Sequence, residues 1–180
     1  MNKSCKVIHE VDVKHLEIIR QTINDLHRQF SEFFDFDRFL ILDVAPEIYK
    51  GCKIYFKNAS VETLDINPSS GATYVADLAD CAKVPSARFD LIFCTEVLEH
   101  TNDPISCAKS LNRLVKDGGI VVVTTPFNFR IHNPLPDNWR FTEHGLRLIF
   151  KAAGFSRIEL TEIASERELM PIQYITKLYK

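Results

Sequence analysis

Apolar side chains recur at helical spacing in three segments of the chain. Over residues 13–34 they return every three or four positions, which is the pattern of an amphipathic helix that buries one face. The same spacing returns over residues 103–115, where a glycine pair follows and predicts a glycine cap, and over residues 142–154, where Thr142 is the expected N-cap. We therefore expect one helix near the N-terminus and two in the second half.

Short, continuous apolar runs predict strands that are buried on both faces. They lie at residues 38–44, 61–66, 72–77, 89–94, 119–125, 155–161 and 172–179. Strands that alternate with helices indicate an α/β fold with a mostly parallel sheet and right-handed crossovers.

The length of 180 residues suits one domain with one core. We expect an N-terminal helical segment over residues 1–36 and an α/β core over residues 37–180. Apolar residues make up 46% and charged residues 26%, as in soluble globular proteins. No stretch approaches the roughly 18 apolar residues of a membrane span, and no signal-peptide pattern is visible, so a soluble protein is expected.

The cysteines and the charge balance exclude several classes of protein. The five cysteines include no CxxC pair, which argues against a zinc ribbon or a disulfide framework and predicts reduced thiols in the cytoplasm. The 22 basic residues against 24 acidic ones lack the surplus that a nucleic-acid binder carries. We therefore expect neither nucleic acid nor a membrane as a partner.

Aspartates close three of the predicted strands: Asp43, Asp65 and Asp77. The carboxyl ends of parallel strands meet at one edge of a sheet, which is where such folds bind ligands. Asp65 follows Asp43 by 22 positions, near the roughly 20-residue interval at which an acidic residue accepts hydrogen bonds from a ribose. Three carboxylates in this register indicate a nucleotide-like ligand.

Residues 89–100 read FDLIFCTEVLEH, residues 114–126 read LVKDGGIVVVTTP, and the last predicted helix ends in Ala153-Gly154-Phe155. This combination resembles the class I S-adenosylmethionine-dependent methyltransferases, in particular the compact type 11-like family with a Glu-Val-Leu-Glu-His signature. The resemblance covers most of residues 38–160. It implies a Rossmann-like sheet with an antiparallel strand near the C-terminus, helices on both faces, and S-adenosyl-L-methionine as the cofactor.

The resemblance also implies which residues bind the cofactor. Asp65 would hold the ribose hydroxyls and Asp77 the adenine amino group, with Leu78 stacking nearby and the Cys94-Thr95 backbone beside the methionine part. The expected cofactor-binding residues are Asp43, Ala45, Glu47, Asp65, Ile66, Asp77, Leu78, Cys94, Thr95 and Glu96.

The loop after the first predicted strand departs from the family pattern. Where members have Asp-x-Gly-x-Gly-x-Gly, this chain has Ala45, Glu47 and Tyr49 at the glycine places, although glycine there lets the backbone turn tightly and approach the ligand. The Glu47 carboxylate would either pair with the cofactor's amino group or hinder binding. This departure motivates one alternative, a non-catalytic scaffold with a methyltransferase fold.

Glu96 and His100 are expected to face the transfer site. The implied reaction is an in-line attack of an oxygen or nitrogen atom on the sulfonium methyl group, so the enzyme supplies alignment and, for a hydroxyl, removal of a proton. His100 and His132 are the candidate catalytic bases. The alternative for His100 is a helix-start residue that bonds to backbone.

Residues 126–141 contain three prolines and show no periodicity, which predicts a long loop at the carboxyl end of the fifth strand. The loop resembles one in small methyltransferases encoded with surface-polysaccharide enzymes. The expected acceptor-binding residues are Phe127, Asn128, Trp139 and Arg140. An aromatic ring and an arginine suit a sugar or sugar-phosphate acceptor. The alternative is that Trp139 and Phe141 anchor the loop to the core.

A metal-dependent enzyme is the second alternative. Glu96, Glu99 and His100 share one face, and with His132 they resemble the Mg²⁺ or Mn²⁺ site of small-RNA 3′-terminal 2′-O-methyltransferases. The missing basic surplus argues against RNA, and the signature also occurs in metal-free relatives. We therefore expect a metal-independent methyltransferase that acts on a small molecule and that remains active in the presence of chelators.

Overall fold

The computed structural model describes residues 10–46, 51–164 and 170–180. The helices of this part of the chain are α1 (Glu10–Phe34), α2 (Pro104–Leu114) and α3 (Glu143–Ala152). The strands are β1 (Leu40–Val44), β2 (Ser60–Asp65), β3 (Tyr74–Val75), β4 (Phe89–Thr95), β5 (Val115–Pro126), β6 (Arg157–Ile163) and β7 (Gln173–Tyr179). Two short 3-10 turns, η2 (Gly51–Ile54) and η3 (Leu98–His100), follow β1 and β4.

The strands form one sheet in the order β3-β2-β1-β4-β5-β7-β6. β1 to β5 pair in parallel, whereas β7 runs antiparallel to both β5 and β6. The predicted Rossmann-like sheet with an antiparallel strand near the C-terminus is confirmed. The carboxyl ends of β1, β2 and β4 therefore share one edge of the sheet.

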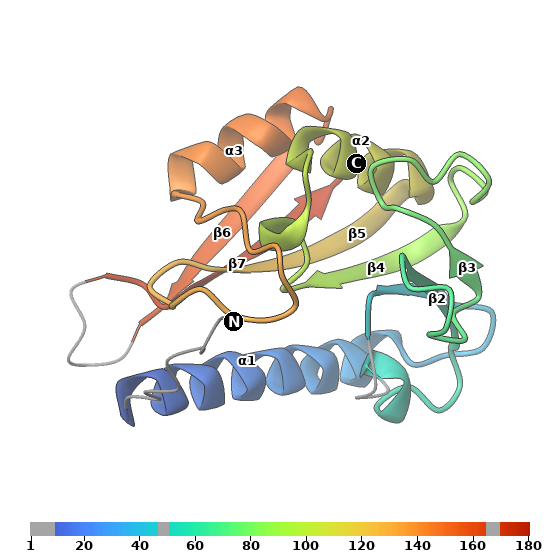
Figure 1. The fold of residues 1–180 in the computed structure, drawn as a ribbon. Coiled ribbons are helices and arrows are strands. Elements are labelled where there is room, and N and C mark those ends of the chain that lie inside the picture. The colour runs from blue at the N-terminus through green and yellow to red at the C-terminus, as the bar shows by residue number, and fades with distance from the viewer. Residues whose placement is uncertain (1–9, 47–50, 165–169) are drawn as a thin grey trace.

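Helices cover both faces of the sheet, as predicted. Figure 1 shows α1 along one face and both α2 and α3 on the other. Leu111 and Phe150 join α2 and α3 to one buried cluster, and Leu26 and Phe30 join α1 to the second. Burial of these apolar faces, at about 25 cal/mol per Å² removed from water, holds the three layers together.

In the first half of the sheet, the connections between strands and the strand β3 are shorter than the sequence pattern predicts. Within the described residues, the connections from β1 to β4 contain no α-helix and only the turn η2. β3 is two residues long, against six in the predicted run at 72–77, because the chain turns at Asp77, whose carbonyl accepts a hydrogen bond from the backbone N–H of Asp80. Short connections leave this edge of the sheet open.

The predicted glycine cap of α2 is wrong. The helix ends at Leu114, and Val115 is already extended and paired with Phe89. Gly118 has φ +78°, so it makes a turn, and a Cβ on Gly119 would lie 2.9 Å from the carbonyl oxygen of Asp90. These glycines therefore serve the approach of β5 to β4 and not the helix end.

Side-chain caps fix the starts of α2 and α3. The Asp103 carboxylate accepts hydrogen bonds from the backbone N–H groups of Ile105 and Ser106. Thr142 Oγ1 accepts one from Gly145 N, which confirms Thr142 as the N-cap. The segment between β4 and α2 contains η3. The Asp103 cap fixes where this segment ends and α2 begins.

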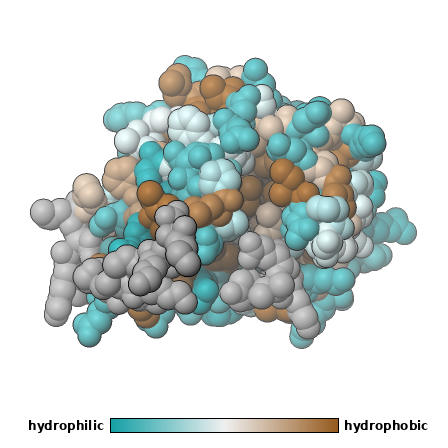
Figure 2. All heavy atoms as spheres, viewed as in Figure 1, coloured by the Kyte–Doolittle hydropathy of each residue, from teal (hydrophilic) through white to brown (hydrophobic). Residues whose placement is uncertain are grey.

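The surface in the view of Figure 2 is mostly hydrophilic, and its apolar side chains form separate groups. Among the described residues, no helix combines the length and the apolar character that a membrane crossing requires.

Candidate active site

A cavity of about 970 Å³ lies at the carboxyl ends of β1, β2 and β4, with α1 along one side. This volume suits a cofactor-sized ligand, since such sites measure roughly 300–1,000 Å³. The lining includes ten of the residues expected from the sequence: Asp43, Ala45, Asp65, Ile66, Asp77, Leu78, Thr95, Glu96, His100 and His132. The topology thus brings the cofactor and catalytic candidates together.

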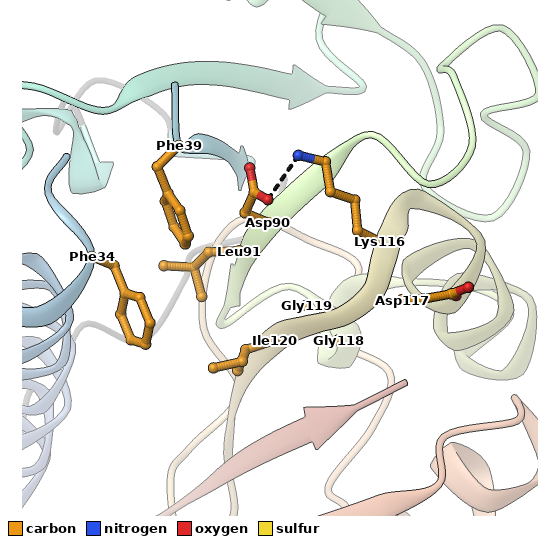
Figure 3. A pocket seen from close by; sticks show the side chains of 9 residues that line it. All are labelled: Phe34, Phe39, Asp90, Leu91, Lys116, Asp117, Gly118, Gly119 and Ile120. Atoms are coloured by element: carbon orange, nitrogen blue, oxygen red, sulfur yellow. Dashed lines mark hydrogen bonds and ion pairs between the residues drawn. The ribbon is translucent and has the colours of Figure 1, made fainter. Parts of the chain in front are cut away.

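A second pocket, of about 120 Å³, lies at the start of β4 beside the Gly118-Gly119 turn (Figure 3). Asp90 and Lys116 form an ion pair of 2.7 Å there, and Asp90 also accepts a hydrogen bond from Leu40 N. These contacts tie three strands together at the sheet edge opposite the large cavity. The pocket is too small for a nucleotide-sized ligand.

The start of η2 lies against the Asp43 carboxylate. This carboxylate is buried and accepts a hydrogen bond of 2.7 Å from Cys52 N, while burial raises its pKa to about 6. A Cβ on Gly51 would lie 1.9 Å from Asp43 Oδ2, and Gly51 has φ +51°. Gly51 is therefore a glycine that this loop requires, and the sequence pattern did not single it out.

Ala45 adopts a left-handed backbone conformation, which glycine favours. Its φ is +52°, and its backbone N–H donates a hydrogen bond of 2.7 Å to Leu64 O on the neighbouring strand. The single methyl group is thus accommodated at this glycine place. Glu47 and Tyr49 lie outside the described residues.

The ends of β2 and β3 place two carboxylates at the cavity. Asp65 Oδ1 accepts a hydrogen bond from Asn67 N, and Asp77 Oδ1 accepts one from Ala79 N, both of 2.8 Å. Each aspartate thus uses one oxygen to shape its own turn. Ile66 lines the cavity with 67% of its surface exposed, so its apolar side chain is open to a ligand.

β4 delivers Thr95 and Glu96 to the cavity. Glu96 has φ +52°, and its Oε1 accepts hydrogen bonds from Thr124 Oγ1 (2.8 Å) and Gln173 Nε2 (2.7 Å). Burial raises its pKa to about 6. Cys94, in contrast, is fully buried in the core and is not among the lining residues, so only its backbone remains available to the predicted role.

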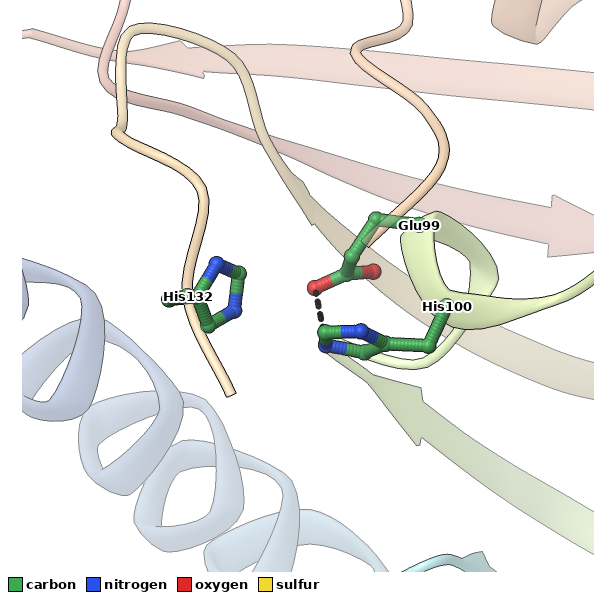
Figure 4. A group of neighbouring side chains, drawn as sticks. All are labelled: Glu99, His100 and His132. Atoms are coloured by element: carbon green, nitrogen blue, oxygen red, sulfur yellow. Dashed lines mark ion pairs between the residues drawn. The ribbon is translucent and has the colours of Figure 1, made fainter. Parts of the chain in front are cut away.

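Glu99, His100 and His132 form a tight group beside Glu96 (Figure 4). Glu99 is fully buried, and its Oε1 lies 3.7 Å from His100 Nε2. The two imidazole rings lie edge to face with centroids 5.0 Å apart. Burial and the neighbouring Glu96 carboxylate raise the pKa of Glu99 well above its usual range.

An oxygen atom lies beside the Nδ1 atom of each histidine. His100 Nδ1 forms a hydrogen bond of 3.0 Å with the carbonyl oxygen of Pro136, whereas His132 Nδ1 lies 3.0 Å from Asp137 Oδ2 without the geometry of a hydrogen bond. A carbonyl can only accept, so His100 Nδ1 carries the proton and its Nε2 is the free acceptor.

The loop of residues 126–141 reaches the cavity through its first half. Phe129, His132, Asn133 and Pro134 are among the lining residues, whereas Phe127, Asn128, Trp139 and Arg140 are not. Phe127 N and Asn128 N donate hydrogen bonds to the carbonyl oxygens of Ile172 and Pro171. Trp139 Nε1 donates to Thr101 O, and Phe141 is buried in the core.

Arg140, expected to bind the acceptor, does not line the cavity. Its guanidinium donates five hydrogen bonds, two to the Asp137 carboxylate and the others to the carbonyl oxygens of Phe129, Arg130 and Trp139. Because these contacts occupy the guanidinium within the loop, Arg140 does not support a phosphate-bearing acceptor.

Several lining residues come from α1, and sequence analysis missed them: Leu16, Ile19, Arg20, Ile23, Asn24 and His27. The buried His27 lies on the inner face of the helix, and burial lowers its pKa to about 4. A histidine on an apolar helix face was the available signal. Periodicity predicts such a face but not the element that it covers.

Comparisons with known proteins agree with this geometry. Residues 45–160 match the family described as a methyltransferase domain. A ubiquinone biosynthesis O-methyltransferase of Xanthomonas oryzae pv. oryzae is 31% identical over 84 residues, which cover 47% of this chain and 32% of that protein. The chain therefore matches about a third of the length of such curated relatives.

Solved structures share the fold at low sequence identity. An S-adenosylmethionine-dependent methyltransferase from Archaeoglobus fulgidus is 14% identical with a TM-score of 0.66, over 96% of this chain and all of that one. Phosphoethanolamine N-methyltransferase 2 of Haemonchus contortus, in complex with S-adenosyl-L-methionine, is 15% identical with a TM-score of 0.60, over 78% of this chain and 38% of that one. The chain belongs to the methyltransferase domain family, with the class I fold and S-adenosyl-L-methionine as the family's cofactor.

Proposed function

We propose that the protein transfers the methyl group of S-adenosyl-L-methionine to an oxygen atom of a small-molecule acceptor. The observation that carries this proposal is the large cavity, in which strand-end carboxylates occupy one end and His100 and His132 the other. A methyltransferase needs this pair of subsites side by side, because the donor and the attacking atom must meet in line.

The cofactor would extend along the ends of β1, β2 and β4. Asp65 would accept hydrogen bonds from the ribose hydroxyls, and Asp77 from the adenine amino group. Ile66 and Leu78 would cover the faces of the adenine ring, which suits the exposure of Ile66 in the cavity. The backbone at Ala45 and Thr95 would hold the methionine part near Asp43.

The acceptor would bind at the histidine end. His100 Nε2 is free to accept a proton because Pro136 holds Nδ1 in the protonated form. A hydroxyl acceptor needs removal of a proton, and the curated relatives are named O-methyltransferases, so oxygen is the preferred acceptor atom. Because Arg140 is occupied within the loop, the proposal does not extend to a sugar phosphate.

The direct test is calorimetric titration with S-adenosylmethionine and S-adenosylhomocysteine. Asp65→Ala should weaken binding about 10- to 150-fold, because hydrogen bonds to a charged acceptor contribute about 1.5–3 kcal/mol. Asp37→Ala is the matched control, since Asp37 is an exposed carboxylate outside the cavity lining. Equal affinity of the two variants would contradict the placement of the ribose, and no binding by the wild type would favour the non-catalytic scaffold.

A further inference from the structure

We propose that Glu99, His100 and His132 bind a divalent transition-metal ion at the acceptor end of the cavity. One ligand atom from each residue lies within 4.8 Å of the other two, and His100 and His132 line the cavity. Figure 4 shows the three side chains converging from η3 and from the loop after β5. This inference replaces our expectation of a metal-free site.

The Glu99 carboxylate is the strongest observation. It is fully buried, and neither of its oxygens has a hydrogen-bond partner among the described residues. Leaving a buried carboxylate without a partner costs several kcal/mol, and native structures avoid this unless a proton, an ion or a ligand compensates. His100 Nε2 lies 3.7 Å from Glu99 Oε1. A cation between them would satisfy both groups.

Both histidines have an oxygen atom close to Nδ1, and for His100 this contact is a hydrogen bond. Each has its Nδ1 atom 3.0 Å from an oxygen, the Pro136 carbonyl for His100 and the Asp137 carboxylate for His132. Metal-binding histidines almost always have such an oxygen behind them, because it fixes the ring and makes the ligating nitrogen more basic. The Asp137 carboxylate is in turn held by Arg140. Arg140 is thus a positioning residue, since it acts through Asp137 and His132.

The donor atoms must move closer together to share one ion. Donor atoms bound at about 2.1 Å from a tetrahedral metal lie roughly 3.4 Å apart, so atoms that now lie within 4.8 Å of one another would close by up to roughly 1.4 Å. Side-chain rotation supplies a movement of this size.

The ligand set indicates which metals fit. Two imidazoles and one carboxylate suit Mn²⁺, Fe²⁺, Co²⁺ and Zn²⁺, whereas Mg²⁺ and Ca²⁺ prefer sites made of oxygen ligands alone. Three protein ligands also leave coordination positions open. If the proposed function holds, an acceptor hydroxyl would occupy one of them, and the metal would lower the pKa of that hydroxyl. In that case the two histidines act as ligands and not as free bases.

The test is the titration of tag-free, chelator-treated protein with Co²⁺, Zn²⁺ and Mg²⁺ by calorimetry, with the visible spectrum of Co²⁺ as a second readout. We expect one equivalent of Co²⁺ or Zn²⁺ to bind at least tenfold more tightly than Mg²⁺. His132→Ala and Glu99→Gln should each weaken this binding at least tenfold. His144→Ala is the matched control, because His144 is an exposed histidine on α3 and should leave the binding unchanged.

A thermal readout keeps the test informative if a variant changes stability. Without metal, Glu99→Gln should unfold at a higher temperature than the wild type, because the uncompensated carboxylate is gone. Adding Zn²⁺ should raise the unfolding temperature of the wild type but not of this variant. The absence of wild-type binding, or a loss of binding no greater than in His144→Ala, would overturn the proposal. Titration of the same samples with S-adenosylmethionine tests the methyltransferase function separately.

Discussion

The buried carboxylates at the two ends of the cavity differ in their hydrogen bonding. At the end formed by β1 and β2, Asp43 and Asp65 each accept a hydrogen bond from a backbone N–H group of the loop that follows. At the end formed by η3, both oxygens of Glu99 lack a hydrogen-bond partner within the described residues. The first set of carboxylates shapes the chain that surrounds the cavity, whereas the Glu99 carboxylate makes no such hydrogen bond and is the group that we propose binds a metal ion.

The contacts that hold the chain in place also differ between the two ends. A glycine, Gly51, gives the loop its close approach to Asp43. The histidine end instead depends on the ion pair between Arg140 and Asp137, whose carboxylate has no exposed surface. Substitutions at these supports should therefore break the two ends separately, with the largest effect expected at Arg140 and the smallest at Asp43.

Arg140→Ala should lower the free energy of unfolding by about 3–5 kcal/mol, because it removes the cationic partner of the buried Asp137 carboxylate. Urea unfolding measures this loss. Arg147→Ala is the matched control, since its pair with Glu143 on α3 is largely exposed and such pairs contribute at most about 1 kcal/mol. Similar losses in the two variants would show that the loop does not depend on Arg140.

Gly51→Ala should cost about 2–4 kcal/mol, since it combines a left-handed backbone with a clash against Asp43. Gly71→Ala provides the comparison, because Gly71 has φ +72° but a Cβ added there would meet no atom within 4 Å, so only the backbone penalty of about 1–2 kcal/mol applies. Urea unfolding of both variants measures the difference. If both lose the same stability, the close approach to Asp43 has no energetic consequence.

Asp43→Asn should stabilise the cofactor-free protein at neutral pH. Because burial raises the folded-state pKa of Asp43 from 3.8 to about 6, ionisation costs stability as the pH rises through this window, up to about 3 kcal/mol above pH 6. The asparagine keeps an oxygen for Cys52 N and carries no charge. Chemical denaturation at pH 4 and pH 8 should show the two proteins nearly equal at the lower pH and the variant more stable at the higher. A pH-independent difference would contradict the shift.

The sequence predicts most of the sheet because its evidence is local. Continuous apolar runs and the aspartates that end them depend on neighbours within a few positions, so the strands and the gathering of Asp43, Asp65 and Asp77 at one edge of a parallel sheet could be predicted from the pattern. The antiparallel strand near the C-terminus was implied by the family resemblance. The glycine pair after α2 was wrongly predicted to cap the helix, because the reason for glycine at position 119 is a contact with a distant part of the chain. Gly119 must lie close to the backbone of Asp90, and no local pattern reports that contact.

The acceptor end was less predictable for the same reason. His100 and His132 are apparent as chemical candidates. The packing of η3 against a loop more than 25 residues later, which buries Glu99, and the contacts that Arg140 makes within that loop are not visible in the local pattern. The face of α1 that lines the cavity is likewise set by packing and not by its own periodicity. The sequence therefore identifies which residues have suitable chemistry, but it does not identify the contacts that each of them makes.

One crystal structure, of the protein with S-adenosylhomocysteine and Zn²⁺ and with data collected at the zinc absorption edge, tests both ends of the cavity together. We predict that the ribose hydroxyls lie within hydrogen-bond distance of Asp65, with an anomalous peak about 2.1 Å from donor atoms of Glu99, His100 and His132. A ligand outside the cavity would contradict the methyltransferase site. A ligand in place with no anomalous peak at these residues would contradict the metal site alone.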